Sequence, residues 1–314
     1  MKAVPGAVNL DHLRVRRCGS IPVARLMDHF PEELRLVGGH QGIGRRLYTA
    51  DLNRPGLALS GYLEYFSSDR VQVLGNTEVH YMERLAPAQL EFRLERMFSF
   101  EIPAFMCNQP GIPVLTTHLS TDELISRIIV FLSEEFAPST EIHATAVDCY
   151  GVGVMMLGTP GVGKSEVALE LVERGHLLIA DDSVRLKRIR EDTLMASSSI
   201  QIEHHMEIRG VGIIDVKSMF GVMRVSNQKP ISLVVELEEW RSDVDYDRTG
   251  LGEEYVELLN VRVPFIRVPV RPGRNIAIIV EVAALNHRLK EMGINPAELL
   301  NRRILSLMNE GYQG

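Results

Sequence analysis

The sequence has few cysteines, no long apolar run and no concentrated basic segment. Only three cysteines occur in 314 residues, Cys18, Cys107 and Cys149, an odd number without paired spacing, so neither a disulfide framework nor a zinc site is indicated. No segment reaches the apolar length of a membrane span, and residues 1–6 lack the apolar run of a signal peptide. We therefore expect a cytoplasmic protein with reduced thiols and no membrane contact.

Charge and length set further bounds. The net charge of −7 argues against general nucleic-acid binding, because the phosphate backbone demands a concentrated basic surface. Hydrophobic residues make up 45% of the chain and charged residues 24%, which is typical of a globular protein. The chain exceeds the usual size of one domain, so two domains are expected.

The first third of the chain predicts an N-terminal α/β domain. Glycine and proline break its short apolar runs, as alternating strands and helices require. A helix is predicted over residues 123–135, after a possible cap at Thr121. Residues 136–140 then form a plausible hinge, which divides the chain into an N-terminal α/β domain, residues 1–136, and a catalytic domain, residues 137–314.

The second part alternates apolar runs with turn signals. Pro264 and Pro269 confine residues 261–270 to an edge or irregular position, because proline cannot donate a ladder hydrogen bond. Asn295 followed by Pro296 predicts the start of a final helix with one apolar face. Strands are predicted over residues 144–148, 152–157, 177–180, 232–237 and 276–282.

The densest motif is Gly158-Thr159-Pro160-Gly161-Val162-Gly163-Lys164-Ser165. It matches the phosphate-cradling pattern of two glycines, a lysine and a hydroxyl residue at fixed spacing. Residues 152–157 supply the preceding apolar strand, and residues 166–173 read as the following helix. The alternative is a chance glycine-rich turn, but the flanking strand and helix favour binding of a nucleotide or another polyphosphate.

Each residue type in this motif has a physical role. Glycines let backbone N–H groups point at phosphate oxygens beside a helix N-terminus. Lys164 supplies a mobile positive charge, and Ser165 offers its hydroxyl to a Mg²⁺ ion that bridges phosphate oxygens.

Asp181 and Asp182 directly follow the predicted strand over residues 177–180. The carboxyl ends of strands are where open α/β sheets bind ligands, and nucleotide sites use such a carboxylate to hold magnesium or to accept a hydroxyl proton. The alternative is a solvated turn, since Asp-Asp-Ser is also turn chemistry.

A second motif runs from Glu207 to Asp215, with the sequence Glu-Ile-Arg-Gly-Val-Gly-Ile-Ile-Asp. Its glycines, Gly210 and Gly212, serve a bulge or a turn in the plainer interpretation. Glu207 is a candidate magnesium partner if this motif folds beside Ser165.

Three further residues have both a structural and a functional interpretation. His143 precedes the strand leading into the phosphate loop and is close enough in sequence to reach the same pocket, although a lone histidine is more often structural. Arg248 lies in a polar loop, where it is either a surface residue or a group that neutralises phosphate. Trp240, the only tryptophan, is expected to be a packing residue.

Together these motifs resemble those of the bacterial HPr kinase/phosphorylase family. The resemblance is carried by residues 158–165, by Ile179-Ala180-Asp181-Asp182, by His143 and above all by residues 206–215, which resemble the family signature. It extends over nearly the whole chain, because three more segments are similar to family segments: residues 54–62, 69–78 and 268–275.

The resemblance implies a serine kinase of the phosphocarrier protein HPr that also runs the reverse phosphorolysis, in which inorganic phosphate releases pyrophosphate. It implies ATP, or pyrophosphate, as phosphoryl donor with Mg²⁺, and a P-loop domain similar to that of phosphoenolpyruvate carboxykinase. It further implies a homohexamer.

By the same resemblance, Asp182 accepts the serine proton and returns it in dephosphorylation, and Lys164 holds the phosphates. Ser165 and Glu207 would hold magnesium, and His143 and Arg248 complete the site. Residues 269–274 resemble the part that matters mainly for dephosphorylation.

Two other functions are compatible with the motifs. A P-loop kinase of small molecules needs no N-terminal module that docks a protein. A regulatory protein without catalytic activity would bind ATP through residues 158–165 and would not need Asp182.

Overall fold

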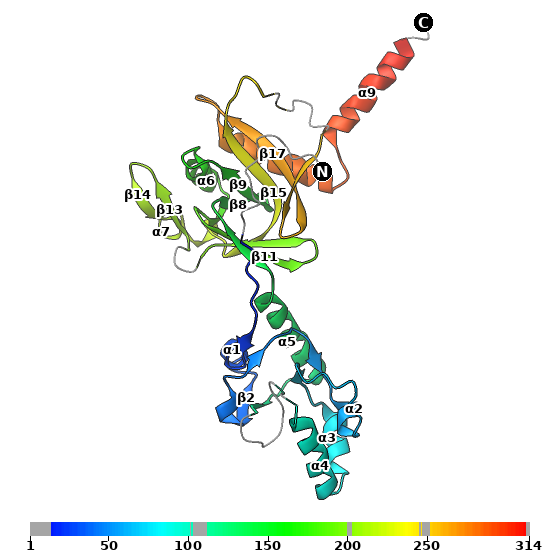
Figure 1. The fold of residues 1–314 in the computed structure, drawn as a ribbon. Helices are drawn as coiled ribbons and strands as arrows, with labels where there is room; N and C mark the ends of the chain where they lie inside the picture. Colours follow the sequence, from blue (N-terminus) through cyan, green and yellow to red (C-terminus); the bar gives the residue numbers. More distant parts are fainter. Residues whose placement is uncertain are drawn as a thin grey trace. The chain divides into compact units, whose positions relative to one another are not determined.

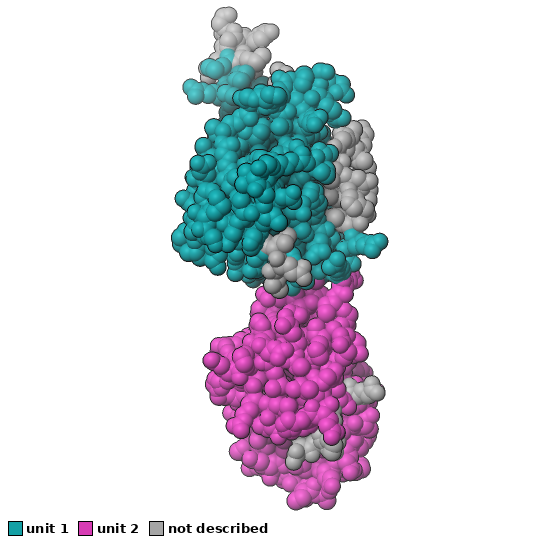
Figure 2. Space-filling model, turned by 90° about the vertical axis from the view of Figure 1, so that its left-hand side faces the viewer, with its two compact units in different colours: residues 1–16, 138–314 teal, residues 17–137 magenta. Residues whose placement is uncertain are grey.

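The computed structural model describes residues 14–100, 102, 112–199, 203–244, 246 and 252–311; Arg248 lies outside these residues. The chain divides into two compact units, residues 17–137 and residues 1–16 with 138–314, which are coloured magenta and teal in Figure 2. Both units combine helices and strands, so the architecture is a two-domain α/β fold, as the sequence predicts.

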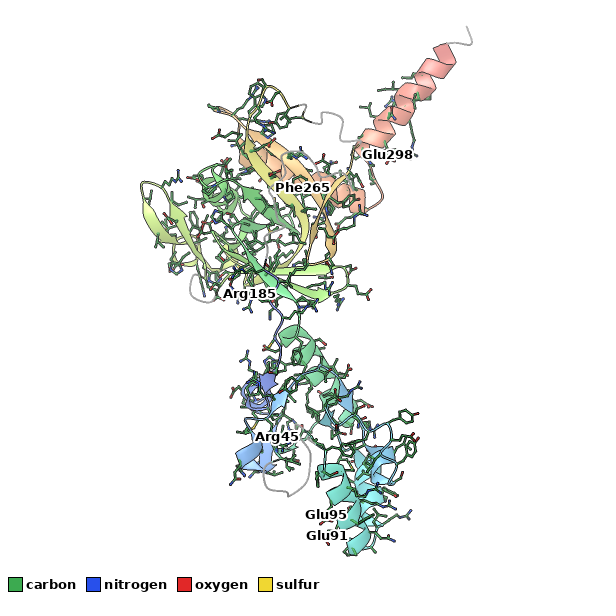
Figure 3. The ribbon with its side chains drawn as sticks, viewed as in Figure 1. Arg45, Glu91, Glu95, Arg185, Phe265 and Glu298 are labelled. Atoms are coloured by element: carbon green, nitrogen blue, oxygen red, sulfur yellow. The ribbon has the colours of Figure 1, made fainter. Side chains whose placement is uncertain are left out.

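The unit of residues 17–137 contains short strands and helices around two apolar clusters. One cluster gathers Leu26, Leu47, Val71 and Leu132, and the other gathers Leu59 and Met97. The side chain of Arg45, labelled in Figure 3, donates to the carbonyl of Ile102. The strands pair two by two: β1 (Ile21–Pro22) with β3 (Arg46–Leu47), β2 (Arg35–Gly38) with β6 (Val114–Thr116), and β4 (Leu52–Asn53) with β5 (Val71–Gln72).

Helices make up most of the rest of this unit. The predicted helix over residues 123–135 is present, but it begins at Thr121, and its cap is Ser120, whose Oγ accepts from the backbone N–H of Glu123 at 3.3 Å. The helices are α1 (Ala24–His29), α2 (Gly56–Leu59), α3 (Asn76–Glu83), α4 (Pro87–Phe98), α5 (Thr121–Glu135) and the short 3₁₀ turn η1 (His40–Gly42).

The other unit is built on a mixed sheet, which in the described part of the chain has nine strands (Figure 1). The order along the main path is β10-β8-β9-β15-β12-β11-β7, and β17 and then β16 extend from β15. The strands are β7 (Ser139–Ile142), β8 (Thr145–Cys149), β9 (Val152–Gly158), β10 (Leu177–Ala180), β11 (Val184–Arg190), β12 (Thr193–Ser197), β15 (Gln228–Glu239), β16 (Glu254–Leu258) and β17 (Val261–Val270).

The remaining elements of this unit are a hairpin and several helices. Figure 1 shows the hairpin of β13 (His205–Ile208) and β14 (Gly212–Asp215) beside the phosphate-loop helix, and a final helix that projects beyond the sheet. None of the helices in the described ranges is both long enough and apolar enough to cross a membrane. The helices are α6 (Lys164–Glu173), α7 (Val216–Phe220), α8 (Ile276–Glu291), α9 (Pro296–Gly311) and the 3₁₀ turn η3 (Val222–Arg224).

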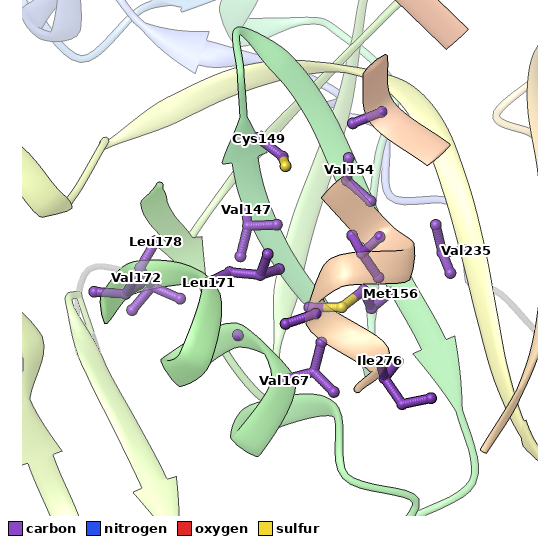
Figure 4. Close-up of a cluster of buried hydrophobic side chains, with 14 of the residues drawn as sticks. Val147, Cys149, Val154, Met156, Val167, Leu171, Val172, Leu178, Val235 and Ile276 are labelled. Carbon is purple, nitrogen blue, oxygen red and sulfur yellow. The ribbon is translucent and has the colours of Figure 1, made fainter. Parts of the chain in front are cut away.

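The apolar core lies on both faces of the sheet, because successive residues of a strand point to opposite sides. On one face, Val154, Met156 and Val235 pack against Leu171 of α6 and Ile276 of α8 (Figure 4). On the other face, Met155, Leu157 and Val234 pack with residues of β7, β11, β12 and β17. The central strands β9 and β15 are therefore buried on both faces, which explains why each reads as a continuous apolar run.

One prediction about the C-terminal part was wrong. Residues 276–282 form the start of helix α8, not a strand: the side chain of Asn275 caps the helix by accepting from the N–H of Ile278 at 2.9 Å. Its buried residues Ile276, Ala277, Val280 and Ala284 follow helical spacing, which a short apolar run does not distinguish from a strand. The final helix, α9, begins at Pro296 as predicted.

For β17, residues 261–270, the sequence predicts an edge or irregular position. The strand pairs with β15 on one side and β16 on the other, but these partners overlap only at Phe265. Pro264 is paired only toward β16, and Pro269 only toward β15. Each half of β17 therefore has a partner strand on one side only, and each proline lies in an edge segment, as the sequence predicts.

Candidate active site

The glycine-rich loop joins the end of β9 to the start of α6. Strand β9 pairs parallel to β15 and antiparallel to β8, so the loop leaves the sheet at the carboxyl ends of two parallel strands. Helix α6 begins at Lys164 because Gly163, with φ of 102°, turns the chain into it, and its residues Val167, Ala168, Leu171 and Val172 are buried against the sheet. The N-terminus of this helix faces the loop, the arrangement that favours an anion.

Two glycines of the loop are required by its geometry. Gly158 has φ of +149°, and a Cβ at this position would lie 2.4 Å from the carbonyl oxygen of Leu237 on β15. Gly161 has φ of +87°, and a Cβ there would lie 3.0 Å from Nη1 of Arg209. A side chain at either position would collide with a neighbour or strain the backbone.

Lys164 folds back over the loop that precedes it. Its ammonium Nζ donates to the carbonyl oxygens of Gly158 at 3.0 Å and Thr159 at 3.4 Å, and it lies 3.4 Å from Nε2 of His143. The residue is only 6% exposed, and burial lowers the pKa of its amine. A buried ammonium held by neutral carbonyls is available to an anion that enters the loop.

Ser165 connects the loop to the acidic end of β10. Its hydroxyl donates to Oδ1 of Asp181 at 3.0 Å, and the hydroxyl of Thr145 on β8 donates to the same oxygen at 2.7 Å. The other carboxylate oxygen of Asp181, Oδ2, is buried and has no hydrogen-bond partner among the described residues. Burial raises the pKa of Asp181.

This geometry fits a hard divalent cation. Mg²⁺ prefers hydroxyl, carboxylate and water oxygens, and Ser165 and Asp181 offer the first two side by side. The buried Oδ2 of Asp181 is an acceptor whose desolvation a cation or its bound water would offset. The described residues contain no cluster of three or more His, Cys, Asp or Glu side chains suited to a metal, so any cation here must complete its coordination with substrate oxygens or water.

Asp182 and His143 form an exposed pair beside Lys164. Oδ1 of Asp182 lies 3.0 Å from Nδ1 of His143, and the two side chains are 68% and 49% exposed. Asp182 has φ of +64°, a left-handed conformation that aspartate tolerates better than most residues. This backbone turn directs the two successive aspartates differently: Asp181 is buried against Ser165, whereas Asp182 is open to solvent and contacts His143.

The hairpin of β13 and β14 brings a further cation to the loop. Met206 and Ile208 pack on the core, so Glu207 between them is on the opposite, exposed side of β13. Arg209 follows in the turn of the hairpin, and its guanidinium lies against Gly161. Within the described part of the chain, no hydrogen bond or ion pair joins Glu207 to Ser165.

The predicted site residues are thus only partly brought together. Lys164, Ser165, Asp182 and His143 meet around the loop, whereas Glu207 is on the neighbouring hairpin and Arg248 lies outside the described residues. Sequence reasoning assigned no role to Thr145 or Arg209, and it named Asp181 only together with Asp182 as a candidate for magnesium binding or proton transfer. The motifs containing Asp181 and Arg209 were visible in the sequence, but nothing in the sequence indicated that Thr145 reaches the site.

The prediction that Trp240 is a packing residue was wrong. The residue is 42% exposed, and the guanidinium carbon of Arg271 lies 3.3 Å from the centroid of its ring.

The site defines a phosphate-binding-loop protein. It consists of a parallel strand, a glycine-rich loop and a helix that starts with Lys164 and Ser165, and the Ser165 hydroxyl donates a hydrogen bond to Asp181. Models of two protein families also match the chain. Residues 21–132 match the HPr Serine kinase N terminus, and residues 134–304 match the HPr Serine kinase C-terminal domain. The chain belongs to the HPr serine kinase family.

Individual relatives agree over most of the chain. It is 42% identical over 302 residues to the HPr kinase/phosphorylase of Halalkalibacterium halodurans, and this alignment covers 92% of this chain and 97% of the relative. It is 43% identical over 308 residues to the HPr kinase/phosphorylase of Bacillus cytotoxicus, covering 93% and 100%. A solved structure, the Hpr(Ser) kinase/phosphatase from Coxiella burnetii, is 34% identical, covers 49% of this chain and 93% of its own, and has a TM-score of 0.46.

Proposed function

We propose that this protein transfers a phosphoryl group from ATP, or from pyrophosphate, to a serine of the phosphocarrier protein HPr, and removes it by phosphorolysis. The observation that carries the proposal is the chain of contacts from Lys164 through His143 to Asp182 beside the glycine-rich loop. This chain joins a phosphate-binding cation to a solvent-accessible carboxylate, which are the two groups that transfer to a hydroxyl needs.

The donor would bind with its phosphates in the loop of residues 158–165. Backbone N–H groups and the N-terminus of α6 favour the anion, and Lys164 would exchange its contacts with the Gly158 and Thr159 carbonyls for phosphate oxygens. We assign Ser165 and Glu207 to Mg²⁺, with Asp181 orienting the Ser165 hydroxyl. Mg²⁺, when bound, neutralises charge on the phosphate oxygens.

Asp182 would perform the proton chemistry. In the forward direction its carboxylate takes the proton of the serine hydroxyl as that oxygen bonds to the terminal phosphorus and the bond to the leaving phosphate breaks. His143 holds the carboxylate: because an ammonium has only donors, Nε2 of His143 accepts from Lys164, and Nδ1 carries the proton that is donated to Asp182. The histidine therefore orients the base and links it to Lys164.

The same groups would serve the reverse reaction. An oxygen of inorganic phosphate bonds to the phosphorus of phosphoserine, and the bond to the serine oxygen breaks. Asp182 then returns its proton to that oxygen, and pyrophosphate leaves. Arg248 would add positive charge near the transferred group, and residues 269–274 would act mainly in this direction.

We assign the reaction to the domain of residues 137–314 and a separate module to residues 1–136. A homohexamer in the cytoplasm completes the proposal; the mass of the purified protein in solution tests the assembly.

The decisive experiment incubates the purified chain with ATP labelled in its terminal phosphate, Mg²⁺ and the HPr of the same organism. We expect the label on one serine of HPr, and release of labelled pyrophosphate when phosphorylated HPr is then given inorganic phosphate. ATP binding without transfer to any protein would overturn the proposal in favour of a regulatory protein. Transfer to a small molecule but not to HPr would identify a metabolic kinase.

A further inference from the structure

A large cavity lies between β17, the end of β15 and helix α8. It has a volume of about 1040 Å³ and is bounded by those strands and by helix α8. Phe265 of β17, labelled in Figure 3, and Ile279 of α8 contribute apolar surface, and Trp240, Arg271 and Arg274 contribute to its lining. Charged side chains, among them Glu253, Glu254, Arg267 and Lys290, also line it, and its volume is that of cavities that bind small molecules.

Trp240 and Arg271 are held together by the backbone. The N–H of Trp240 donates to the carbonyl of Val270 at 3.2 Å, which extends the ladder of β15 and β17 by one residue. Arg271 follows Val270 in the chain, and its guanidinium carbon lies 3.3 Å from the centroid of the Trp240 indole ring. The sheet therefore presents a partly exposed indole and a planar cation as one surface, which suits a flat aromatic ligand.

The positive charges of the cavity differ in their pairing. Arg267 forms an ion pair with Glu254 at 3.2 Å, and Lys290 forms one with Glu253 at 3.2 Å. Within the described ranges, Arg271 and Arg274 have no carboxylate partner; Arg274 donates only to the carbonyl of Pro269, at 3.2 Å. Two guanidinium groups thus remain available to stack on a ligand ring or to donate hydrogen bonds to it.

The cavity is close to the glycine-rich loop across the sheet. Gly158, where the loop begins, is opposite Leu237 of β15, and Leu237 is opposite Val268 of β17. Two steps between neighbouring strands span roughly 10 Å. Both features lie at the carboxyl ends of the parallel strands β9, β15 and β17, so one elongated ligand can occupy both.

We propose that this cavity is the subsite for the nucleoside of the donor nucleotide, with the base on the Trp240–Arg271 surface and the phosphates on the glycine-rich loop. The proposal rests on the proposed function, because it assigns the non-reacting part of the same donor. A free phosphate would leave most of the cavity and the indole ring unused, whereas a nucleoside supplies a flat ring.

The test compares two donors that share phosphates and differ in the nucleoside. Binding of ATP and of pyrophosphate to the full-length protein is measured by calorimetry in the presence of Mg²⁺, for the wild type and for Trp240→Ala and Trp240→Phe. We expect Trp240→Ala to weaken ATP binding about tenfold, the loss typical of a removed stacking partner, and to change pyrophosphate binding by less than about twofold. Trp240→Phe restores most of the affinity for ATP.

A matched pair of arginine variants controls for the loss of a stacked cation. Arg262 lies over the ring of Tyr255 at 4.6 Å on the same sheet but does not line the cavity, so Arg262→Ala leaves ATP binding unchanged, whereas Arg271→Ala weakens it. Circular dichroism confirms that each variant is folded.

Three results would overturn the inference. The first is unchanged ATP binding in Trp240→Ala, and the second is an equal loss for ATP and pyrophosphate. The third is ATP binding at the cavity that persists in Lys164→Ala, which would indicate a separate effector site. Failure of the proposed function is distinct: the wild type would then bind ATP as expected here but transfer no phosphate to HPr.

Discussion

His143 and Asp182 are 3.0 Å apart, and the other nitrogen of the same imidazole ring is 3.4 Å from the ammonium of Lys164. The imidazole therefore connects the residue that would hold phosphate to the residue that would take the serine proton. Because Asp182 is 68% exposed on its side chain, a hydroxyl of a partner protein has access to it. A carboxylate that is both oriented and accessible is what a reaction on a protein substrate requires.

Asp182→Asn should abolish transfer while preserving donor binding. The amide cannot take a proton, so we expect kcat for HPr phosphorylation to fall by about 10²- to 10⁴-fold, the usual contribution of a general base. The affinity for ATP, measured by calorimetry, should change little because Lys164 and the loop are intact. A variant with normal kcat would exclude Asp182 as the base.

Asp181→Asn should stabilise the protein without Mg²⁺. The buried Oδ2 has no partner among the described residues, and the pKa of Asp181 is raised by burial. Asp181 therefore keeps its proton to a higher pH in the folded state than in the unfolded state. As a result, the free energy of unfolding of the wild type falls as pH rises from the ordinary pKa of aspartate through the raised pKa of Asp181. We expect the variant to be more stable by about 1 kcal/mol at pH 7, with a smaller difference in acid.

Urea unfolding at several pH values without Mg²⁺ measures this difference. Asp182→Asn is the matched control: its side chain is exposed, so its stability should differ from the wild type by less than about 0.5 kcal/mol. Lower stability of Asp181→Asn throughout the pH range would contradict the explanation. The same variant should lose kinase activity, because the group that orients Ser165 has lost its charge.

Glu281→Gln should destabilise the protein at neutral pH. Glu281 of α8 is 6% exposed and accepts from Arg174 at 2.6 and 3.0 Å, and His176 lies 2.8 Å away. The hydrogen bond from Arg174 lowers the pKa of Glu281 despite its burial. We expect a loss of about 2 kcal/mol, as for hydrogen bonds to charged groups.

The loss in Glu281→Gln should depend on pH with a defined sign. A lowered carboxyl pKa contributes stability above the unfolded value, and this contribution disappears as pH falls through the folded pKa. The variant and the wild type should therefore converge in acid, as measured by chemical unfolding. Glu298→Gln, which breaks an exposed pair with Arg302, should change stability by less than about 0.5 kcal/mol at any of these pH values.

Cys149 should be chemically inert although it lies 3.6 Å from a ring nitrogen of His176. Burial, the largest cause, raises the pKa of its thiol to about 12, so hardly any thiolate forms near neutrality. At pH 8 iodoacetamide should modify the exposed Cys18 and leave Cys149 intact until the protein is unfolded. Peptide mass spectrometry separates the sites, and rapid native labelling of Cys149 would show that the cysteine and histidine form a reactive pair.

The parts of the fold that sequence predicts well are those whose local signals agree. For β9, the glycine-rich loop and α6, an apolar run, glycines and helical periodicity all indicate the same structure. The run from Ile276 to Val282 is mostly apolar, so it fits the spacing of a helix as well as that of a strand, and the sequence predicts a strand. In the structure, the cap at Asn275 and the packing of α8 against α6 favour the helix. Both prolines of β17 are tolerated because of how its neighbours overlap, which is a tertiary property.

The same distinction holds for the candidate site. Lys164 and Ser165 are adjacent in sequence, so their motif places them together. Arg209 reaches Gly161 only through the hairpin, and Trp240 meets Arg271 only through the pairing of β15 with β17. Contacts between residues far apart in sequence depend on strand order, which local patterns do not encode.

Helices α6 and α8 are joined at two places: Glu170 accepts from the side chain of Asn275, and Arg174 donates to Glu281. Because α6 starts at the glycine-rich loop and α8 lines the cavity, these hydrogen bonds link the two sites directly. Occupation of the loop would thereby be communicated to the helical wall of the cavity through two helices on the same face of the sheet.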